Sequence, residues 1–200
     1  MGDYDRALAD FDKALELDSN LTAALANRAR AYEVQGDFQK ALADRTKAVE
    51  LAPQDAGALA GLAYTKFDAG NFREASADLA RSLELKDNIY ATLFRYLARR
   101  RIGEHLASQE LEASSRHLKS KDWPYAIVEL YLGTRPPAQA LEAASKPEQQ
   151  CEAQFYAAQW YILRNAASDA EPLLRKAVGS CPATFIEYTA ANAELKRLGR

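Results

Sequence analysis

Apolar and small side chains recur along this chain at intervals of three and four residues, the spacing of one face of an α-helix. Between residues 3 and 18 this face would carry Tyr4, Ala7, Leu8, Phe11, Ala14 and Leu15. Near the other end, Phe185, Tyr188, Ala191 and Leu195 repeat the pattern. Polar and charged residues occupy most of the positions between them. The pattern predicts an all-α protein.

A segment built around a glycine position repeats every 34 residues. It occurs as Gly2-Asp3-Tyr4, Gly36-Asp37-Phe38 and Gly70-Asn71-Phe72, and alanines align in the same register at Ala7, Ala41 and Ala75. The small residues allow two antiparallel helices to pack closely, and the glycine ends the first of them. The period resembles that of the tetratricopeptide repeat. This resemblance implies helical hairpins stacked into a right-handed superhelical solenoid.

We expect residues 1–200 to form a single helical-repeat domain. Its repeats are expected at residues 22–55, 56–88 and 151–184, with a degenerate repeat at 89–121. A half repeat (1–20), two short helices (122–147) and a C-terminal capping helix (184–198) complete it. In the last repeat Asn165 takes the glycine position.

The beginning of the chain falls in the middle of a repeat. Met1-Gly2-Asp3 stands where the loop between the two helices of a hairpin is expected. The helix over residues 3–18 would then expose its apolar face. We therefore expect the chain to be a fragment of a longer product, or this face to pair with a second copy.

A second resemblance comes from residues 123–133, which read Trp-Pro-Tyr-Ala-Ile-Val-Glu-Leu-Tyr-Leu-Gly. The segment is similar to one in the NlpI-like bacterial lipoproteins, as are Phe155-Tyr156, Ala177-Val178 and Phe185-Ile186-Glu187 after it. The resemblance implies a non-catalytic scaffold or adaptor, often a homodimer, that holds cell-wall enzymes. It also implies a full-length protein in the periplasm or associated with the outer membrane. The alternative is a cytosolic tetratricopeptide co-chaperone or assembly factor.

Charge and motifs exclude several other classes of function. The chain has 26 Lys and Arg against 28 Asp and Glu, a net charge of −2, which is unlike the strongly basic surface of a nucleic-acid-binding protein. No apolar run is long enough for a membrane span. No motif for a phosphate, a cofactor or a catalytic nucleophile occurs, so we expect no enzyme and no cofactor. His105 and His117 would lie about 120° apart on one helix and could not share a metal ion.

The two cysteines stand near the two ends of the last repeat. In an antiparallel hairpin, Cys151 and Cys181 would face each other, so a disulfide is geometrically reasonable. The alternative is a pair of free buried thiols in a cytosolic protein. The resemblance to envelope proteins favours the bridge.

A stack of such hairpins is expected to curve, with the first helix of each repeat on the concave face. The expected peptide-binding groove is lined by Asn27, Arg30, Tyr64, Phe67, Phe94 and Arg101. Aromatic rings beside charges suit a peptide, because rings supply desolvated area and charges set its register. The alternative is that Phe67 or Phe94 packs against the next helix, or that the C-terminal helix fills the groove.

Two further features bear on a partner. Asn27 resembles an asparagine of the dicarboxylate clamp of some tetratricopeptide domains, but the basic clamp positions of the next repeat are Gly57 and Gly61. The densest basic cluster is Arg95, Arg99, Arg100 and Arg101. It indicates either a solvated helix face or a surface for an acidic partner, whose affinity would fall with salt.

Overall fold

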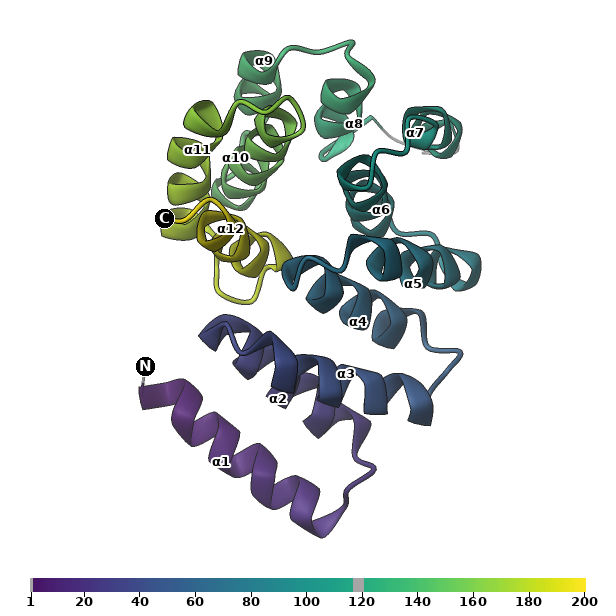
Figure 1. Cartoon of the computed structure of the whole chain (residues 1–200), viewed down its shortest axis with the longest axis vertical. Coiled ribbons are helices and arrows are strands. Elements are labelled where there is room, and N and C mark those ends of the chain that lie inside the picture. The colour runs from purple at the N-terminus through teal and green to yellow at the C-terminus, as the bar shows by residue number, and fades with distance from the viewer. Residues whose placement is uncertain (1, 117–120) are drawn as a thin grey trace. The chain divides into compact units, whose positions relative to one another are not determined.

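The computed structural model describes residues 2–116 and 121–200, and within these ranges it contains twelve α-helices and no strand (Figure 1). The predicted all-α class is confirmed. The helices are α1 (Gly2–Leu17), α2 (Thr22–Gln35), α3 (Phe38–Leu51), α4 (Ala56–Asp68), α5 (Phe72–Leu85), α6 (Ile89–Arg101), α7 (Ala107–Ser115), α8 (Tyr125–Leu132), α9 (Pro137–Glu142), α10 (Pro147–Ile162), α11 (Ala167–Ser180) and α12 (Ile186–Arg197).

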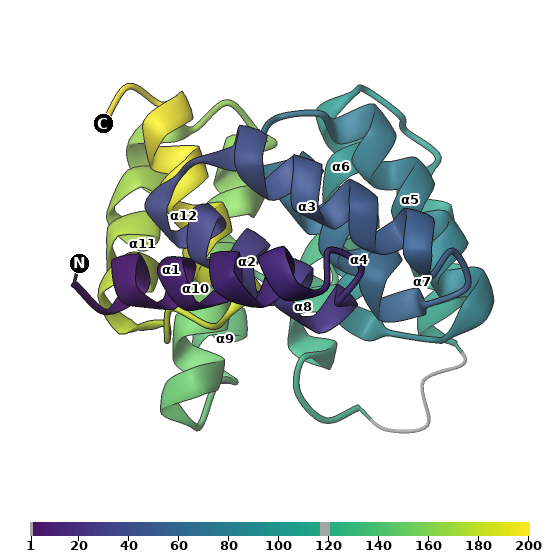
Figure 2. The same ribbon diagram turned by 90° about the horizontal axis from the view of Figure 1, so that it is seen from below.

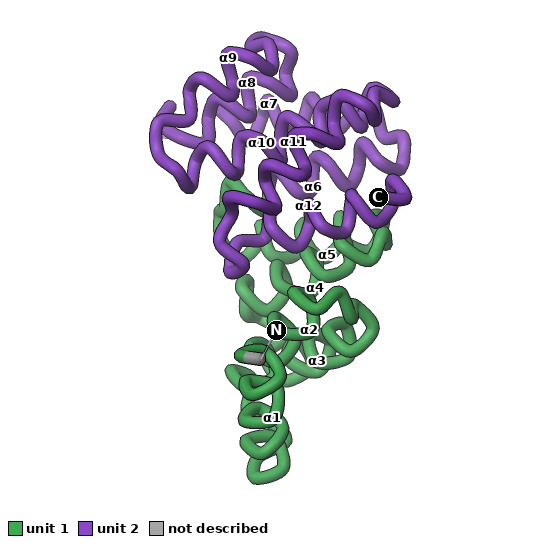
Figure 3. Tube along the Cα trace, turned by 90° about the vertical axis from the view of Figure 1, so that its left-hand side faces the viewer, with its two compact units in different colours: residues 1–91 green, residues 92–200 purple. Residues whose placement is uncertain are grey.

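The chain divides into two compact units, residues 1–91 and 92–200, which Figure 3 colours separately. The division falls inside α6. Each unit has its own set of packed helices. They are described in turn below.

Unit 1 consists of two helical hairpins, α2–α3 and α4–α5, preceded by α1. Each hairpin packs on the next through α3 and α4, and α1 packs on α2; Figure 2 shows the helices α1 to α3 from below. Alanines without exposed surface recur in these helices, among them Ala29, Ala41, Ala63 and Ala75. A methyl group at these positions lets the helix backbones come close, as the 34-residue period predicted.

The turns inside the hairpins follow from local chemistry. Gly36 ends α2 with φ 77°, and its N–H and that of Asp37 bond to the carbonyls of Glu33 and Tyr32. A left-handed backbone of this kind favours glycine. In unit 2, Asn165 adopts φ 58° after α10. The glycine-like position predicted for Asn165 is therefore confirmed.

In unit 2 the best-formed hairpin is α10–α11, and α12 packs on both of its helices. The start of this hairpin differs from the prediction, because α10 begins at Pro147 and not at residue 151. A proline in the first turn of a helix loses no hydrogen bond, so Pro147 starts the helix and does not interrupt the chain. The helices α8 and α9 also pack on α10.

The core of unit 2 is aromatic. Phe94 of α6 stacks on Phe155 of α10 with ring centroids 5.7 Å apart, and Tyr96 of α6 stacks on Tyr131 of α8 at 4.9 Å. Tyr156 joins the two pairs through edge contacts with Phe94 and Tyr131. These rings fill the space between α6, α8 and α10. Among the described helices, none is long and apolar enough to cross a bilayer.

Candidate functional site

The six residues predicted to line a groove do not share one surface. Phe67 and Phe94 have no exposed surface, and each packs on a neighbouring ring, Phe67 on Phe72 and Phe94 on Phe155. The prediction that these two rings line an open groove is wrong. Burying a phenylalanine side chain stabilises the fold by about 1.5–3 kcal/mol, so these rings contribute to the stability of the core. The alternative stated above, packing against the next helix, is confirmed for Phe67, which contacts α5, whereas Phe94 of α6 packs against α10, a helix further along the chain.

The side chain of Arg101 is also largely buried. Its side chain is 16 % exposed and forms an ion pair of 2.8 Å with Glu194 of α12, which is itself 1 % exposed. A second contact joins Arg101 to Gln159 of α10 at 3.4 Å. The C-terminal helix therefore contacts Arg101, as the alternative of a groove filled by that helix requires. The role of Arg101 in binding stays a prediction.

The other three predicted residues lie in unit 1. Asn27 is exposed, whereas Arg30 and Tyr64 are half-buried. Arg30 forms an ion pair of 3.2 Å with Glu33, one turn further along α2. Asn27 and Tyr64 lie on α2 and α4, the first helices of two successive hairpins. Their role in binding stays a prediction.

A hollow of about 280 Å³ lies between these two helices and α3. We call it the α2/α4 hollow, and it is lined by Thr22, Ala23, Ala26, Arg45, Ala48, Ala52, Asp55, Gly57 and Ala58. Most of these side chains are small. Because small side chains leave the helix surface accessible, an inserted group can approach the backbone of α2 and α4 closely.

Arg45 is the residue of this hollow that sequence reasoning missed. It comes from α3, but its guanidinium reaches across to α4, where a Cβ added to Gly61 would lie 2.8 Å from its Nη1. Two hydrogen bonds of 3.0 and 3.2 Å join it to the buried carboxylate of Glu33. The hydroxyl of Thr65 donates to the same carboxylate. The absence of a side chain at Gly61 therefore makes room for Arg45.

Arg45 supplies a positive charge at Gly61, one of the two clamp positions that carry no charge of their own. The clamp position Gly61 carries no charge of its own, but the positive charge of Arg45 lies directly above it. That charge is already paired with Glu33 inside unit 1. A terminal carboxylate at this position would have to compete with Glu33, which is 5 % exposed and held by Thr65 as well.

In the basic cluster of α6, some arginines form ion pairs and one does not. Arg95 and Arg99 both pair with Glu110 of α7, and Arg99 pairs with Glu104 too. Burial alone would raise the pKa of the Glu110 carboxyl, but the two guanidinium groups outweigh it and hold that pKa below its ordinary value. With Arg101 paired to Glu194, three of the four arginines serve the packing of unit 2. Arg100 is the exception.

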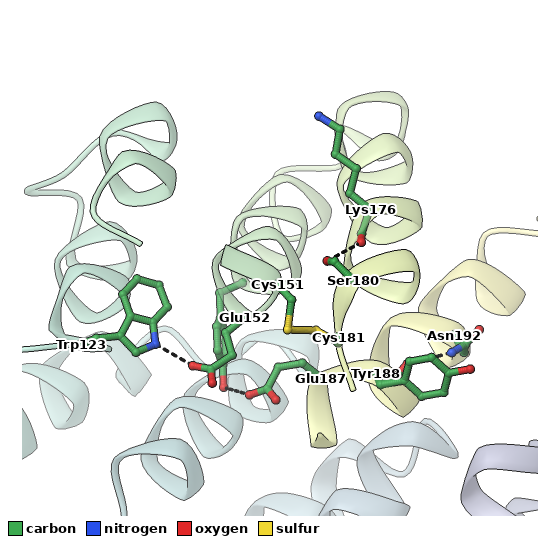
Figure 4. Close-up of a disulfide and its surroundings, with 10 residues drawn as sticks. Trp123, Cys151, Glu152, Lys176, Ser180, Cys181, Glu187, Tyr188 and Asn192 are labelled. Atoms are coloured by element: carbon green, nitrogen blue, oxygen red, sulfur yellow. Dashed lines mark hydrogen bonds between the residues drawn. A yellow bond between two sulfur atoms is a disulfide. The ribbon is translucent and has the colours of Figure 1, made fainter. Parts of the chain in front are cut away.

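The two cysteines are joined in a disulfide between α10 and the residue that ends α11 (Figure 4). Their Cα atoms are 5.1 Å apart, and both residues are buried. Beside the bridge, the indole N–H of Trp123 donates to the carboxylate of Glu152, and the hydroxyl of Tyr156 donates to that of Glu187. These bonds satisfy polar groups that would otherwise be costly to bury.

No group of three or more metal-ligating side chains comes together within residues 2–116 and 121–200. His105 is exposed, and His117 lies outside the described residues.

Comparisons with known proteins agree with this architecture. Residues 1–21 and 22–55 match the family model described as tetratricopeptide repeat. A tetratricopeptide repeat protein from Parabacteroides merdae is similar in structure, with a TM-score of 0.62 and 18 % identity over 97 % of this chain and 78 % of the other. The structure of MamA protein is similar at a TM-score of 0.54 and 20 % identity, covering 90 % of this chain and 83 % of the other. At these identities the likeness shows a shared fold. Residues 1–55 thus match the tetratricopeptide repeat, and the chain shares its helical-repeat fold with these proteins.

Proposed function

We propose that this tetratricopeptide-repeat chain is a non-catalytic scaffold that binds a peptide segment of another protein in the α2/α4 hollow. The observation that carries the proposal is the hollow itself, because it opens between the first helices of two successive hairpins and is lined by small side chains. Stacked helical repeats generally bind their partners on extended surfaces of this kind.

The chemistry around the hollow suits a peptide with one apolar anchor and polar neighbours. Ala23, Ala26 and Gly57 offer apolar, open surface. Asn27 follows Ala23 by one helical turn, and Tyr64 lies two turns beyond Gly57, so both extend the same faces of α2 and α4. An amide can bond to a peptide backbone, and a half-buried tyrosine supplies contact area at small entropic cost.

Filling the hollow tests this proposal. Ala26→Trp places a large ring in the hollow, and Tyr64→Ala removes contact area beside it. Each should reduce recovery of cross-linked partners from the native cell extract at least tenfold, a loss of about 1.4 kcal/mol in binding. Ala43→Trp is the matched control, because Ala43 is an exposed residue of α3 that does not line the hollow. Equal recovery with all three variants would refute binding at the hollow.

We further propose that the partners are envelope proteins such as cell-wall enzymes, and that the full-length protein is periplasmic or associated with the outer membrane. The disulfide supports this compartment, since disulfides persist in the periplasm and are rare in the cytosol. The alternative is a cytosolic co-chaperone or assembly factor. Alkylation of thiols in intact cells, followed by mass spectrometry, decides between them. Alkylation of both Cys151 and Cys181 in the same molecule would show free thiols and favour the cytosol.

A homodimer belongs to the same proposal. The apolar face of α1 remains half-buried at Tyr4, Leu8 and Phe11, and Leu17 is 91 % exposed. A second copy could cover these residues. Sedimentation should show a concentration-dependent dimer that Phe11→Glu abolishes, and a strict monomer at high concentration would exclude it.

A further inference from the structure

Arg100 and Arg164 differ from the other arginines of unit 2. Within the described residues of that unit, every other arginine forms an ion pair with a carboxylate. Neither Arg100, in the last turn of α6, nor Arg164, just after α10, has such a partner in the described part of the chain. Two positive charges without internal counter-ions therefore remain in a unit that otherwise pairs its arginines.

The two arginines belong to one neighbourhood. Phe94 stacks on Phe155, and Arg101 bonds to Gln159, so α6 and α10 lie together from Phe94 to Arg101. Burial lowers the pKa of Arg164, and the positive charge of Arg100 nearby lowers it further. Like charges repel, so holding them close costs free energy unless an anion joins them.

A partly exposed aromatic surface accompanies the charges. The guanidinium of Arg164 lies 3.6 Å from the ring centroid of Trp160, which is in stacking contact, and it also donates to the carbonyl of Trp160 at 3.1 Å. The ring of Tyr161 packs edge-on against Trp160 at 5.1 Å. Both rings are only partly buried. The stacking holds Arg164 in one orientation, so less rotamer freedom is lost when its remaining N–H groups bind a ligand.

We infer that Arg100, Arg164 and Trp160 form a docking surface for an acidic peptide segment of a protein partner. The two guanidinium groups bind its carboxylates, and Trp160 contacts an apolar side chain beside them. Charge complementarity selects this occupant, because guanidinium groups bind carboxylates with two parallel hydrogen bonds, and among the described residues neither Arg100 nor Arg164 forms an ion pair with a carboxylate. The inference rests on the proposed scaffold function and adds a second binding surface, in unit 2.

The test uses the full chain and a defined probe. A fluorescein-labelled octapeptide of alternating glutamate and phenylalanine is titrated with the protein, and fluorescence anisotropy is measured at low and at high salt. Binding should weaken with salt and should be lost when glutamine replaces glutamate in the peptide. Arg100→Gln and Arg164→Gln should each weaken binding about tenfold, the loss of one charge-assisted contact.

Arg175→Gln is the matched control, because it removes the same charge from an exposed arginine that is paired with Glu171 on α11. Its affinity should equal that of the unchanged protein. Quenching of tryptophan emission on binding should disappear in Trp160→Phe. If all three arginine variants bind the octapeptide equally, or the glutamine peptide binds as well, the surface is not a carboxylate site.

The outcome is separable from that of the proposed function. Loss of partners in Ala26→Trp with unchanged recovery in Arg100→Gln would keep the α2/α4 hollow and overturn the acidic-peptide surface. Octapeptide binding that depends on Arg100 and Arg164, together with unchanged partner recovery in Ala26→Trp, would do the opposite. Circular dichroism of each variant distinguishes a lost contact from a lost fold.

Discussion

The disulfide should stabilise unit 2 and leave unit 1 unchanged. Its cysteines are 30 residues apart, so the chain-entropy relation gives a loss of about 12 cal/mol/K in the unfolded state, or about 3.6 kcal/mol near room temperature. Reduction keeps both sulfur atoms and their packing and removes only the covalent link. Reduced and oxidised protein are therefore the cleanest pair to compare.

The chain offers a natural probe for each unit. Both tryptophans, Trp123 and Trp160, belong to unit 2, so their fluorescence reports unfolding of that unit, whereas far-ultraviolet circular dichroism reports helices of both. With an m-value of about 2 kcal/mol/M, reduction should lower the urea midpoint of the fluorescence transition by about 1.8 M. A transition seen only by circular dichroism, and belonging to unit 1, should keep its midpoint.

Two results would refute this reasoning. A fluorescence midpoint that moves by less than about 0.5 M urea would show that the link adds under about 1 kcal/mol. An equal shift in both transitions would show that the two units do not unfold separately. A Cys151→Ala, Cys181→Ala variant tests the same link without a reductant, and should lose additional stability because it also removes buried sulfur atoms.

Three further predictions concern single residues. Burial alone would raise the pKa of Glu194, but hydrogen bonds and charges from Arg197 and Arg101 outweigh it and hold that pKa below its ordinary value of 4.5. The ionised carboxylate therefore stabilises unit 2 above pH 4.5, and this stabilisation is lost as the pH falls through the folded-state pKa. In Glu194→Gln, the free energy of unfolding measured by tryptophan fluorescence should depend less on pH below 4.5. Arg28 joins Asp12 and Asp44 with contacts of 2.7 Å each, so Arg28→Ala should destabilise unit 1 by about 1–2 kcal/mol in circular-dichroism melts, against under about 0.5 for the exposed Arg6→Ala. Asn165, at φ 58°, should tolerate glycine with no loss, whereas Asn165→Ala should cost about 1 kcal/mol in the urea midpoint of unit 2.

The candidate site was predicted less well than the fold. The positions of Asn27 and Tyr64 on successive first helices follow from the repeat, and the structure places them there. Arg45 was missed, because its side chain crosses from α3 to a glycine of α4 and no repeat position marks it as a groove residue. Arg164 and Trp160 could not be identified from the sequence either, because only the structure shows which arginines form ion pairs and which do not.

The helices, their pairing into hairpins and the turn at Asn165 could be predicted from local patterns in the chain. These depend on contacts within one 34-residue repeat, where spacing along the chain and distance in space correspond. The burial of Phe94 and the ion pair of Arg101 with Glu194 could not be predicted in this way. Arg101 meets Glu194 across 93 residues, and α6, α8 and α10 bring Phe94 among rings from separate segments. A residue facing the inside of a repeat is exposed or buried according to whether a later helix folds back onto it, and a local pattern carries no information about that.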